Sequence, residues 1–239
     1  MSNRISLVVV VTCLALLAPA AAAHASARQI TTVEAPGELL YGGAPDAALD
    51  TIADLGAGAI RLQLAWRDVA PDPDATRAPA FNATDPGAYP AAGWARYDAA
   101  IDAARARGLR VLLTITGPAP RWATRKRDGL TNPSATAFGR FATAAGRRYG
   151  TRVAWWSIWN EPNLGKLLKP LYKGRRGRTL ASAGIYRKLY LRAYSGLRTA
   201  RVGAPILLGE LAPQANGLRE TGTIAPLAFL RGVLCLDGR

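Results

Sequence analysis

Histidine and cysteine are almost absent from this chain of 239 residues, which has one histidine and two cysteines. His24 and Cys13 both lie within the first 27 residues, a segment with the features of a secretory signal. If that segment is removed after Ala27, the chain keeps Cys235 and no histidine. Histidine-dependent catalytic triads, histidine-ligated zinc and an intrachain disulfide are then excluded. Acid–base chemistry in the mature protein must come from carboxylates, lysine or tyrosine.

The predicted signal peptide covers residues 1–27. Arg4 precedes a largely apolar run over residues 5–17, and an alanine-rich stretch then offers cleavage after Ala25 or Ala27. The alternative, a membrane anchor, is less favoured because the apolar run is shorter than the roughly 20 residues that a bilayer span needs. No other segment of the sequence resembles a transmembrane helix. We therefore expect a secreted, extracellular protein with no membrane span after signal cleavage.

Acidic residues are scarce, at 16 against 31 lysines and arginines, and the formal net charge is +15. Much of the excess lies in two segments, 121–127 and 166–178. Such segments can bind nucleic acid, an anionic surface or, in a secreted protein, an acidic polysaccharide or cell-wall polymer. We favour a solvated, arginine-rich surface, because the segments lack interleaved aromatic residues on a recognisable nucleic-acid module. No nucleic-acid partner is expected.

Strand and helix patterns alternate five times along the chain. Apolar, β-favouring runs predict strands at 29–34, 59–66, 110–116, from 153 and at 205–211. Helical spacing predicts helices at 46–55, 94–107, 134–150, 180–201 and 223–236. Alternation of this kind predicts a parallel α/β fold, and no glycine-rich phosphate fingerprint follows the first strand. We therefore predict a (β/α)8 TIM-barrel type, truncated after about five of its eight units, in a single domain.

The segment 153–163 contains the first catalytic candidate. Its short apolar run of β-branched and aromatic residues is typical of a strand buried on both faces, and it stops at Asn160-Glu161-Pro162. Parallel α/β folds place their chemistry in the loops that follow the carboxyl ends of the strands. Glu161 is therefore the leading catalytic candidate. The alternative is an ordinary carboxylate at the end of a strand.

The motif Trp159-Asn160-Glu161-Pro162-Asn163 resembles the clan A glycoside hydrolases. These (β/α)8 retaining enzymes include the cellulase-like family 5 and the xylosidase-like family 39. In that clan an Asn-Glu pair ends the fourth barrel strand, and the motif also ends the fourth predicted strand here. The strand from Arg61 to Trp66 is similar to the second strand of the clan, and residues 97–111 are similar to the next helix and strand. The resemblance implies a glycoside hydrolase barrel domain over residues 28–239, incomplete at its C-terminal side.

The resemblance also implies roles for individual residues. Glu161 would be the general acid and base, and it must stay protonated until the glycosidic bond breaks. Asn160 would bind the sugar 2-hydroxyl, and Arg61 would lie beneath the site beside the nucleophile. Trp66 and Trp122 are candidates for stacking on sugar, as is Trp159 at the rim; the alternative for each is packing in the core. No metal or cofactor is implied, because carboxylates and water suffice for the retaining mechanism.

The sequence departs from the clan at two points. The nucleophilic glutamate of the clan ends strand seven, and this chain supplies no such strand. Glu210 ends the fifth predicted strand, where we expect it to line the site or to pair with Arg61 or another arginine. Gly117-Pro118 stands where the clan often has a histidine. We predict a secreted retaining β-glycoside hydrolase with a carbohydrate substrate; the alternative is a catalytically inactive carbohydrate- or cell-wall-binding protein.

Overall fold

The computed structural model describes residues 29–43, 45–174, 179–215 and 222–236. The chain divides into two units, Met1–Ile30 and Thr31–Arg239. The predicted signal peptide, residues 1–27, lies outside the described residues, so the description below concerns the second unit alone. Among the described helices, none combines the length and the apolar character needed to cross a bilayer.

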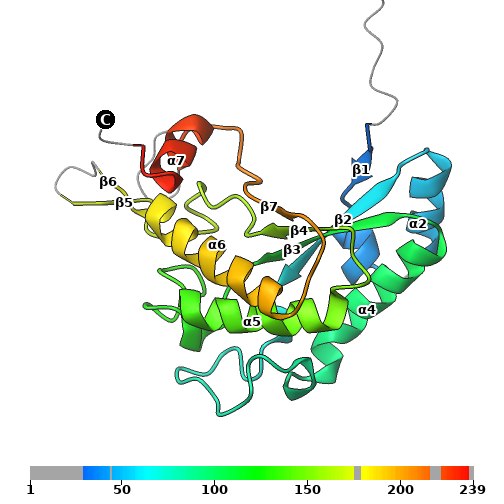
Figure 1. The fold of residues 1–239 in the computed structure, drawn as a ribbon, viewed down its shortest axis with the longest axis horizontal. Coiled ribbons are helices and arrows are strands. Elements are labelled where there is room, and N and C mark those ends of the chain that lie inside the picture. The colour runs from blue at the N-terminus through cyan, green and yellow to red at the C-terminus, as the bar shows by residue number, and fades with distance from the viewer. Residues whose placement is uncertain (1–28, 44, 175–178, 216–221, 237–239) are drawn as a thin grey trace, which may run out of the picture. The chain divides into compact units, whose positions relative to one another are not determined.

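The second unit is built on a five-stranded parallel sheet with the order β1-β2-β3-β4-β7 (Figure 1). The strands are β1 (Thr32–Val33), β2 (Ala59–Ala65), β3 (Arg110–Thr116), β4 (Trp155–Ile158) and β7 (Ile206–Leu207). The longest pairing, between β2 and β3, runs in register from Ala59 opposite Arg110 to Ala65 opposite Thr116. A separate antiparallel pair joins β5 (Tyr172–Lys173) to β6 (Thr179–Leu180). Each strand of the large sheet neighbours the strand of the next unit, which is the topology of a barrel wall.

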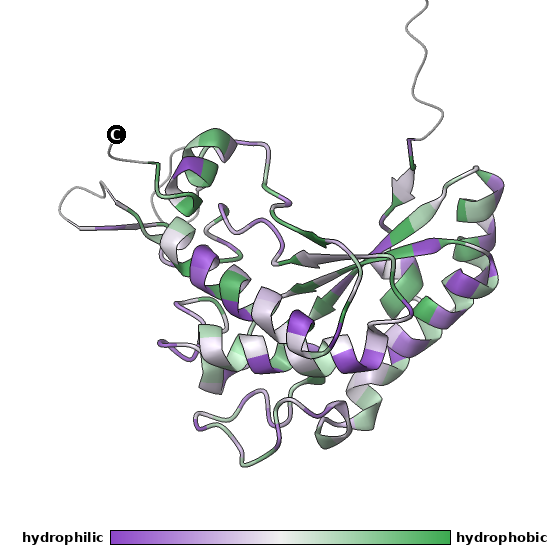
Figure 2. Cartoon of the chain, viewed as in Figure 1, coloured by the Kyte–Doolittle hydropathy of each residue, from purple (hydrophilic) through white to green (hydrophobic). Residues whose placement is uncertain are grey.

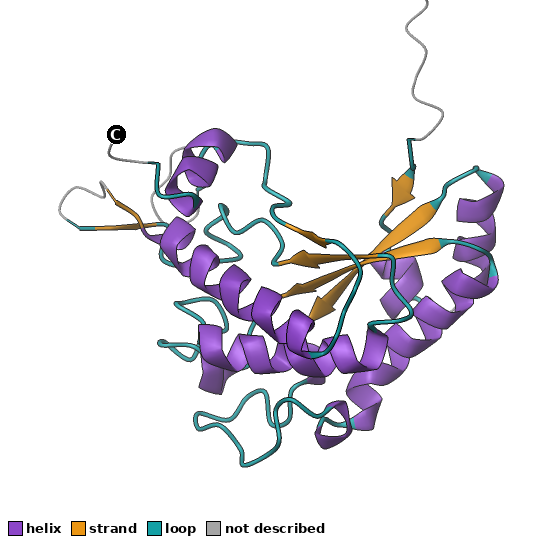
Figure 3. Ribbon diagram, viewed as in Figure 1, coloured by secondary structure: helices purple, strands orange, loops and turns teal. Residues whose placement is uncertain are grey.

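Helices connect successive strands of the sheet, and a last helix follows β7. They are α2 (Pro45–Asp54), α4 (Ala91–Ala106), α5 (Ala135–Tyr149), α6 (Ala181–Thr199) and α7 (Pro226–Val233), with a short α3 (Trp66–Val69) directly after β2. In Figure 3, α4, α5 and α6 lie along one side of the sheet, as helices do on the outside of a barrel. The alternating α/β pattern and the TIM-barrel type predicted from the sequence are confirmed.

Several element boundaries differ from the sequence prediction, and two of these differences have a clear local reason. The fifth strand of the sheet is confined to β7 because Gly209 and Glu210 adopt positive φ angles of 122° and 73°, which turn the chain away from the extended direction. Helix α7 begins at Pro226 rather than at 223, because proline favours the first position of a helix. The backbone N–H of Ile224 is instead bonded to the carbonyl oxygen of Asn163 at 2.9 Å.

The alternation along β2 separates two faces of the sheet. Ile60, Leu62 and Leu64 are buried in the hydrophobic core, whereas Arg61 and Gln63 are half-buried and must point to the opposite face. Figure 2 shows both hydrophobic and hydrophilic residues on the helices, as is usual for helices that pack one side against a sheet and expose the other. Polar side chains of β2 are therefore carried on the inner face of the barrel wall, away from the helices.

Helices α5 and α6 pack closely against each other through glycine. A Cβ atom placed on Gly196 in α6 would lie 2.2 Å from the carbonyl oxygen of Gly139 in α5. A Cβ atom on Gly139 would lie 2.8 Å from the carbonyl oxygen of Arg192. Both distances are shorter than van der Waals contact with backbone, so the absence of side chains at these positions permits the two helices to touch.

Replacing Gly196 by alanine should therefore lower the free energy of unfolding by about 1–3 kcal/mol, the usual cost of overpacking. Gly184 is a matched control in the same helix, because nothing lies within 4 Å of the position of its Cβ. Gly184→Ala should stabilise by about 0.5–1 kcal/mol through lower backbone entropy of the unfolded chain. Urea unfolding of both variants measures the difference. Equal effects of the two substitutions would contradict the close helix contact.

Candidate active site

Arg61 is the centre of a polar network on the inner face of the sheet. Its Nη2 donates to Asn160 Oδ1 at 2.8 Å, and its Nε donates to Thr114 Oγ1 at 3.1 Å and to Glu210 Oε1 at 3.0 Å. The guanidinium also forms ion pairs with Glu34 and, through Nη2, with Glu210. Residues from β2, β3 and the segments after β1, β4 and β7 thus converge on a single cation.

The electrostatics of this network favour a permanently charged Arg61. The side chains of Arg61 and Glu210 are only 14% and 20% exposed. Burial acts to lower the pKa of Arg61, but hydrogen bonds and charge interactions with Glu210, then with Glu34, raise it above its ordinary value. Gln63 supports the second carboxylate by donating from Nε2 to Glu34 Oε1 at 2.6 Å. The expectation that Glu210 pairs with Arg61 is confirmed.

The backbone after β4 is held in an unusual conformation. Trp159 and Glu161 have positive φ angles of 66° and 44°, which cost non-glycine residues roughly 1–3 kcal/mol each. The N–H groups of residues 159, 160 and 161 all donate to neighbouring segments. In chain order, their acceptors are Ile115 O at 2.8 Å, Thr116 Oγ1 at 3.0 Å and Glu210 O at 2.8 Å. These bonds fix the direction in which the Asn160 and Glu161 side chains leave the strand.

Glu161 itself is half-buried, and its carboxylate has no hydrogen-bond partner within the part of the chain that the structure describes. Its backbone carbonyl accepts from the N–H of Leu164 at 2.9 Å, which begins a tight turn. The backbone of Glu161 is thus held next to Asn160 and bonded to the segment after β7 that carries Glu210, while its carboxylate oxygens are available to a ligand.

Asn163 braces this region, although the sequence indicated no role for it beyond its place in the motif. Its side chain is fully buried, and Nδ2 donates to the carbonyl oxygens of Ala212 and Ile224, both at 2.9 Å. Its Oδ1 accepts from the N–H of Ala212 at 2.9 Å. One amide thus connects the turn after Glu161 to the segments after β7 and before α7. An asparagine in a turn is too common for its sequence position to reveal this bracing role.

Trp66 and Trp159 do not line the site. Trp66 is 1% exposed and stacks on Phe141, with ring centroids 5.8 Å apart and planes inclined by 10°. Trp159 is 0% exposed and lies 5.3 Å from the ring of Phe138, at 72°. A fully buried indole has no face left for a sugar, so the prediction that these two residues bind substrate is wrong. Both tryptophans attach the sheet to α5.

Trp122 is half-buried in the loop after β3. Its Nε1 donates to the carbonyl oxygen of Pro71 at 3.2 Å, and its ring meets the edge of Trp66 at 5.6 Å and 88°. The contact of Trp122 with sugar stays a prediction.

The presence of glycine at position 117 is explained by the neighbouring core, because a Cβ atom there would lie 2.7 Å from Cζ2 of Trp159. The buried ring thus requires a very small residue directly after β3.

Comparison with protein families gives the chain its relatives. Residues 22–172 match the family model described as cellulase (glycosyl hydrolase family 5), and this match covers more than half of the chain. The chain belongs to glycosyl hydrolase family 5. The resemblance to clan A drawn from the motif around Glu161 is therefore confirmed. No curated protein matches the chain significantly.

Solved structures share the fold of this family 5 chain. The β-glycosidase of the hyperthermophile Thermosphaera aggregans aligns with a TM-score of 0.51 and 19% identity, over 68% of this chain and 42% of that one. The virulence factor SghA of Agrobacterium tumefaciens, in complex with its substrate analogue salicin, aligns with a TM-score of 0.53 and 21% identity, over 81% of this chain and 41% of that one. Fpglu1 of "fervidobacterium pennivoraus" aligns with a TM-score of 0.54 and 13% identity, over 68% of this chain and 40% of that one. The chain spans about two fifths of the length of these structures.

Removing the amide of Asn163 should destabilise this end of the molecule. In Asn163→Ala, the buried N–H of Ala212 and two carbonyl oxygens lose their partner, which costs about 1–3 kcal/mol for an unsatisfied buried group. Gln214→Ala removes an exposed amide nearby and serves as the control. Hydrogen exchange at Ala212 and Ile224, together with urea unfolding, measures the effect. Unchanged protection in Asn163→Ala would contradict the bracing role.

Proposed function

We propose that this protein is a secreted, retaining glycoside hydrolase that cleaves O-glycosidic bonds in a polysaccharide or oligosaccharide, with Glu161 as general acid and base. The observation that carries the proposal is the Asn160-Glu161 pair after β4 of a family 5 chain, with Asn160 held by Arg61 at 2.8 Å. β-Linked substrates are favoured by the cellulase description of the family and by the β-glycosidase among the solved structures.

The arrangement of the pair supports distinct roles for its two members. Glu161 would protonate the leaving oxygen in the first step and activate water in the second. The Asn160 oxygen is engaged by Arg61, so the NH2 group of the same amide is available to donate to a sugar hydroxyl. A hydrogen bond to the 2-hydroxyl strengthens as the oxocarbenium-like transition state develops, and it therefore accelerates the reaction.

Glu210 is better suited to positioning than to attack on the sugar. Both of its carboxylate oxygens are engaged, by Arg61 and by the hydroxyl of Thr114 at 3.2 and 3.1 Å. Through Arg61, Glu210 fixes the amide of Asn160. The second carboxylate of a retaining site is expected after strand seven of the clan A barrel, which is not among the five strands of this sheet.

Glu161→Gln tests the acid role through the choice of leaving group. Turnover of an aryl β-glycoside with a poor leaving group should fall by about 10²–10⁴-fold, because general acid catalysis is lost. Turnover of a dinitrophenyl glycoside should fall much less in its bond-breaking step, since that leaving group needs no proton. The exposed Glu38 provides the control variant Glu38→Gln.

Equal losses with both leaving groups would contradict the acid role. If the unaltered chain binds oligosaccharides but hydrolyses none, the alternative is supported: a catalytically inactive carbohydrate- or cell-wall-binding protein.

Secretion is tested separately, by the mass and N-terminal sequence of protein recovered from the culture medium. Cleavage after Ala25 or Ala27 gives chains that begin at Ser26 or Arg28. Replacing Leu14 and Leu16 by arginine interrupts the apolar run and should retain the protein in the cell. Extracellular protein that still begins at Met1 would contradict signal cleavage.

A further inference from the structure

The loops that follow β3 and β4 are strongly basic. The β3 loop, residues 117–134, and the β4 loop, residues 162–174, together contain seven basic residues and one acidic residue, Asp128. The basic residues are Arg121, Arg125, Lys126, Arg127, Lys166, Lys169 and Lys173. Both loops extend from the carboxyl ends of strands, on the same side of the sheet as Glu161.

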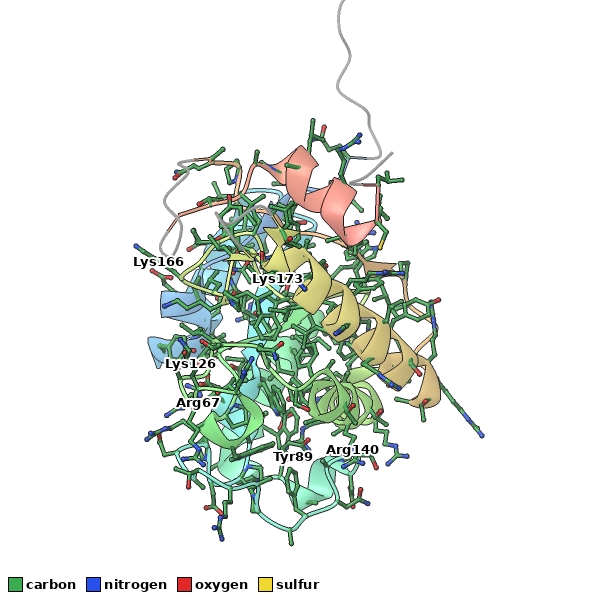
Figure 4. All side chains as sticks on the ribbon, turned by 90° about the vertical axis from the view of Figure 1, so that its left-hand side faces the viewer. Arg67, Tyr89, Lys126, Arg140, Lys166 and Lys173 are labelled. Atoms are coloured by element: carbon green, nitrogen blue, oxygen red, sulfur yellow. The ribbon has the colours of Figure 1, made fainter. Side chains whose placement is uncertain are left out.

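Backbone hydrogen bonds join the two loops into one rim. The N–H of Asn132 donates to the carbonyl oxygen of Lys169 at 2.8 Å, and the N–H of Lys169 donates to the carbonyl oxygen of Leu130 at 3.0 Å. The β4 loop starts at the Glu161 turn. Figure 4 looks at the molecule from the end to which the strands point, and it shows Lys126, Lys166 and Lys173 on this end. Two basic segments distant in sequence therefore form one surface beside the candidate catalytic carboxylate.

The charges of this rim are not neutralised within the described chain. Arg125, Lys126, Arg127, Lys166 and Lys173 are exposed, and no salt bridge among the described residues includes any of the seven basic residues. Asp128 accepts bonds inside the β3 loop, from the N–H of Leu130 at 2.9 Å and from the N–H and hydroxyl of Thr131 at 2.7 and 2.6 Å. Its carboxylate therefore orders the loop rather than pairing with its cations.

The outer helices use their arginines differently. Arg148 and Arg152 on and after α5 share Asp98 of α4, and Arg152 also bonds Asp102 at 2.7 Å. Burial would raise the pKa of Asp98, but the hydrogen bonds from Arg148 and Arg152 hold it below its ordinary value. Part of the excess positive charge is thus compensated on the outer helices, whereas that of the rim faces solvent near Glu161.

We propose that the rim selects an acidic polysaccharide, one whose sugar units carry carboxylates, as the substrate of this site. The inference rests on the proposed glycoside hydrolase function, which places a sugar chain at Glu161. Exposed ammonium and guanidinium groups along the path of that chain attract carboxylates through charge and raise their local concentration. A neutral polymer gains nothing from these groups.

Two cellulose derivatives test the proposal because they share a β-1,4-glucan backbone: carboxymethyl cellulose is anionic and hydroxyethyl cellulose is neutral. The full chain should bind carboxymethyl cellulose at least about tenfold more tightly at low salt, and 1 M salt should remove the preference because the Debye length falls to about 3 Å. Affinity electrophoresis measures both affinities. The triple variant Lys126→Gln, Arg127→Gln, Lys166→Gln should lose the preference.

A second triple variant controls for net charge. Arg105→Gln, Arg140→Gln and Arg192→Gln remove three exposed arginines from α4, α5 and α6 and should leave the preference intact. Equal affinity for the two polymers, or equal loss in both triple variants, overturns the proposal. Competition by duplex DNA as effective as that of carboxymethyl cellulose also overturns it, in favour of unselective polyanion binding.

The proposed function fails by a different measurement. Glu161→Gln is assayed on uncharged aryl glycosides, whereas the charge preference is a binding ratio between two polymers. If Glu161→Gln lowers turnover equally for both leaving groups and the preference for the anionic polymer is retained, the acid role is rejected. The basic rim then remains a binding surface. If Glu161→Gln shows the expected dependence on the leaving group but the chain binds both polymers equally, only the acidic substrate is rejected.

Discussion

The ion pairs of Arg61 with two carboxylates are the interaction on which the inner face of this sheet depends. A guanidinium placed in a barrel wall must be compensated, because a buried charge without partners costs several kcal/mol. Glu34, after β1, and Glu210, after β7, meet this requirement from the two edge strands of the sheet. The same cation holds the amide of Asn160, so a single electrostatic requirement links edge strands and centre and sets the geometry beside Glu161.

Much of the fold could be predicted from periodicity alone. The β3 boundaries agree with the run Arg110–Thr116, and Ser134, expected at a helix start, caps α5 by accepting from the N–H of Ala137 at 3.3 Å. Such elements can be predicted from the sequence because residues close in the chain determine them. The lengths of β1 and β7 were less predictable, since edge strands end where their neighbours and backbone turns permit.

The site was predictable only in part, for a physical reason that differs between residues. Glu161 was singled out because strand ends carry polar chemistry, whereas the roles of Asn160 and Arg61 came from the resemblance to the clan A enzymes. Trp66 and Trp159 were misplaced, because sequence position near a strand end does not show whether α5 covers the ring. Asn163 and Glu34 were missed since their partners are distant in sequence and common in type.

The glycine contact between α5 and α6 has a consequence for the curvature of the sheet. Helix α5 precedes β4 in the chain and α6 follows it, so the distance between these helices limits how far the outer layer can spread around that strand. Hydrogen bonds fix the spacing of the strands, so helix backbones that touch keep the outer layer short relative to the sheet and hold the sheet to a gentler arc. Two positions without side chains thereby help to determine the radius of the wall on whose inner surface Arg61 and Asn160 meet.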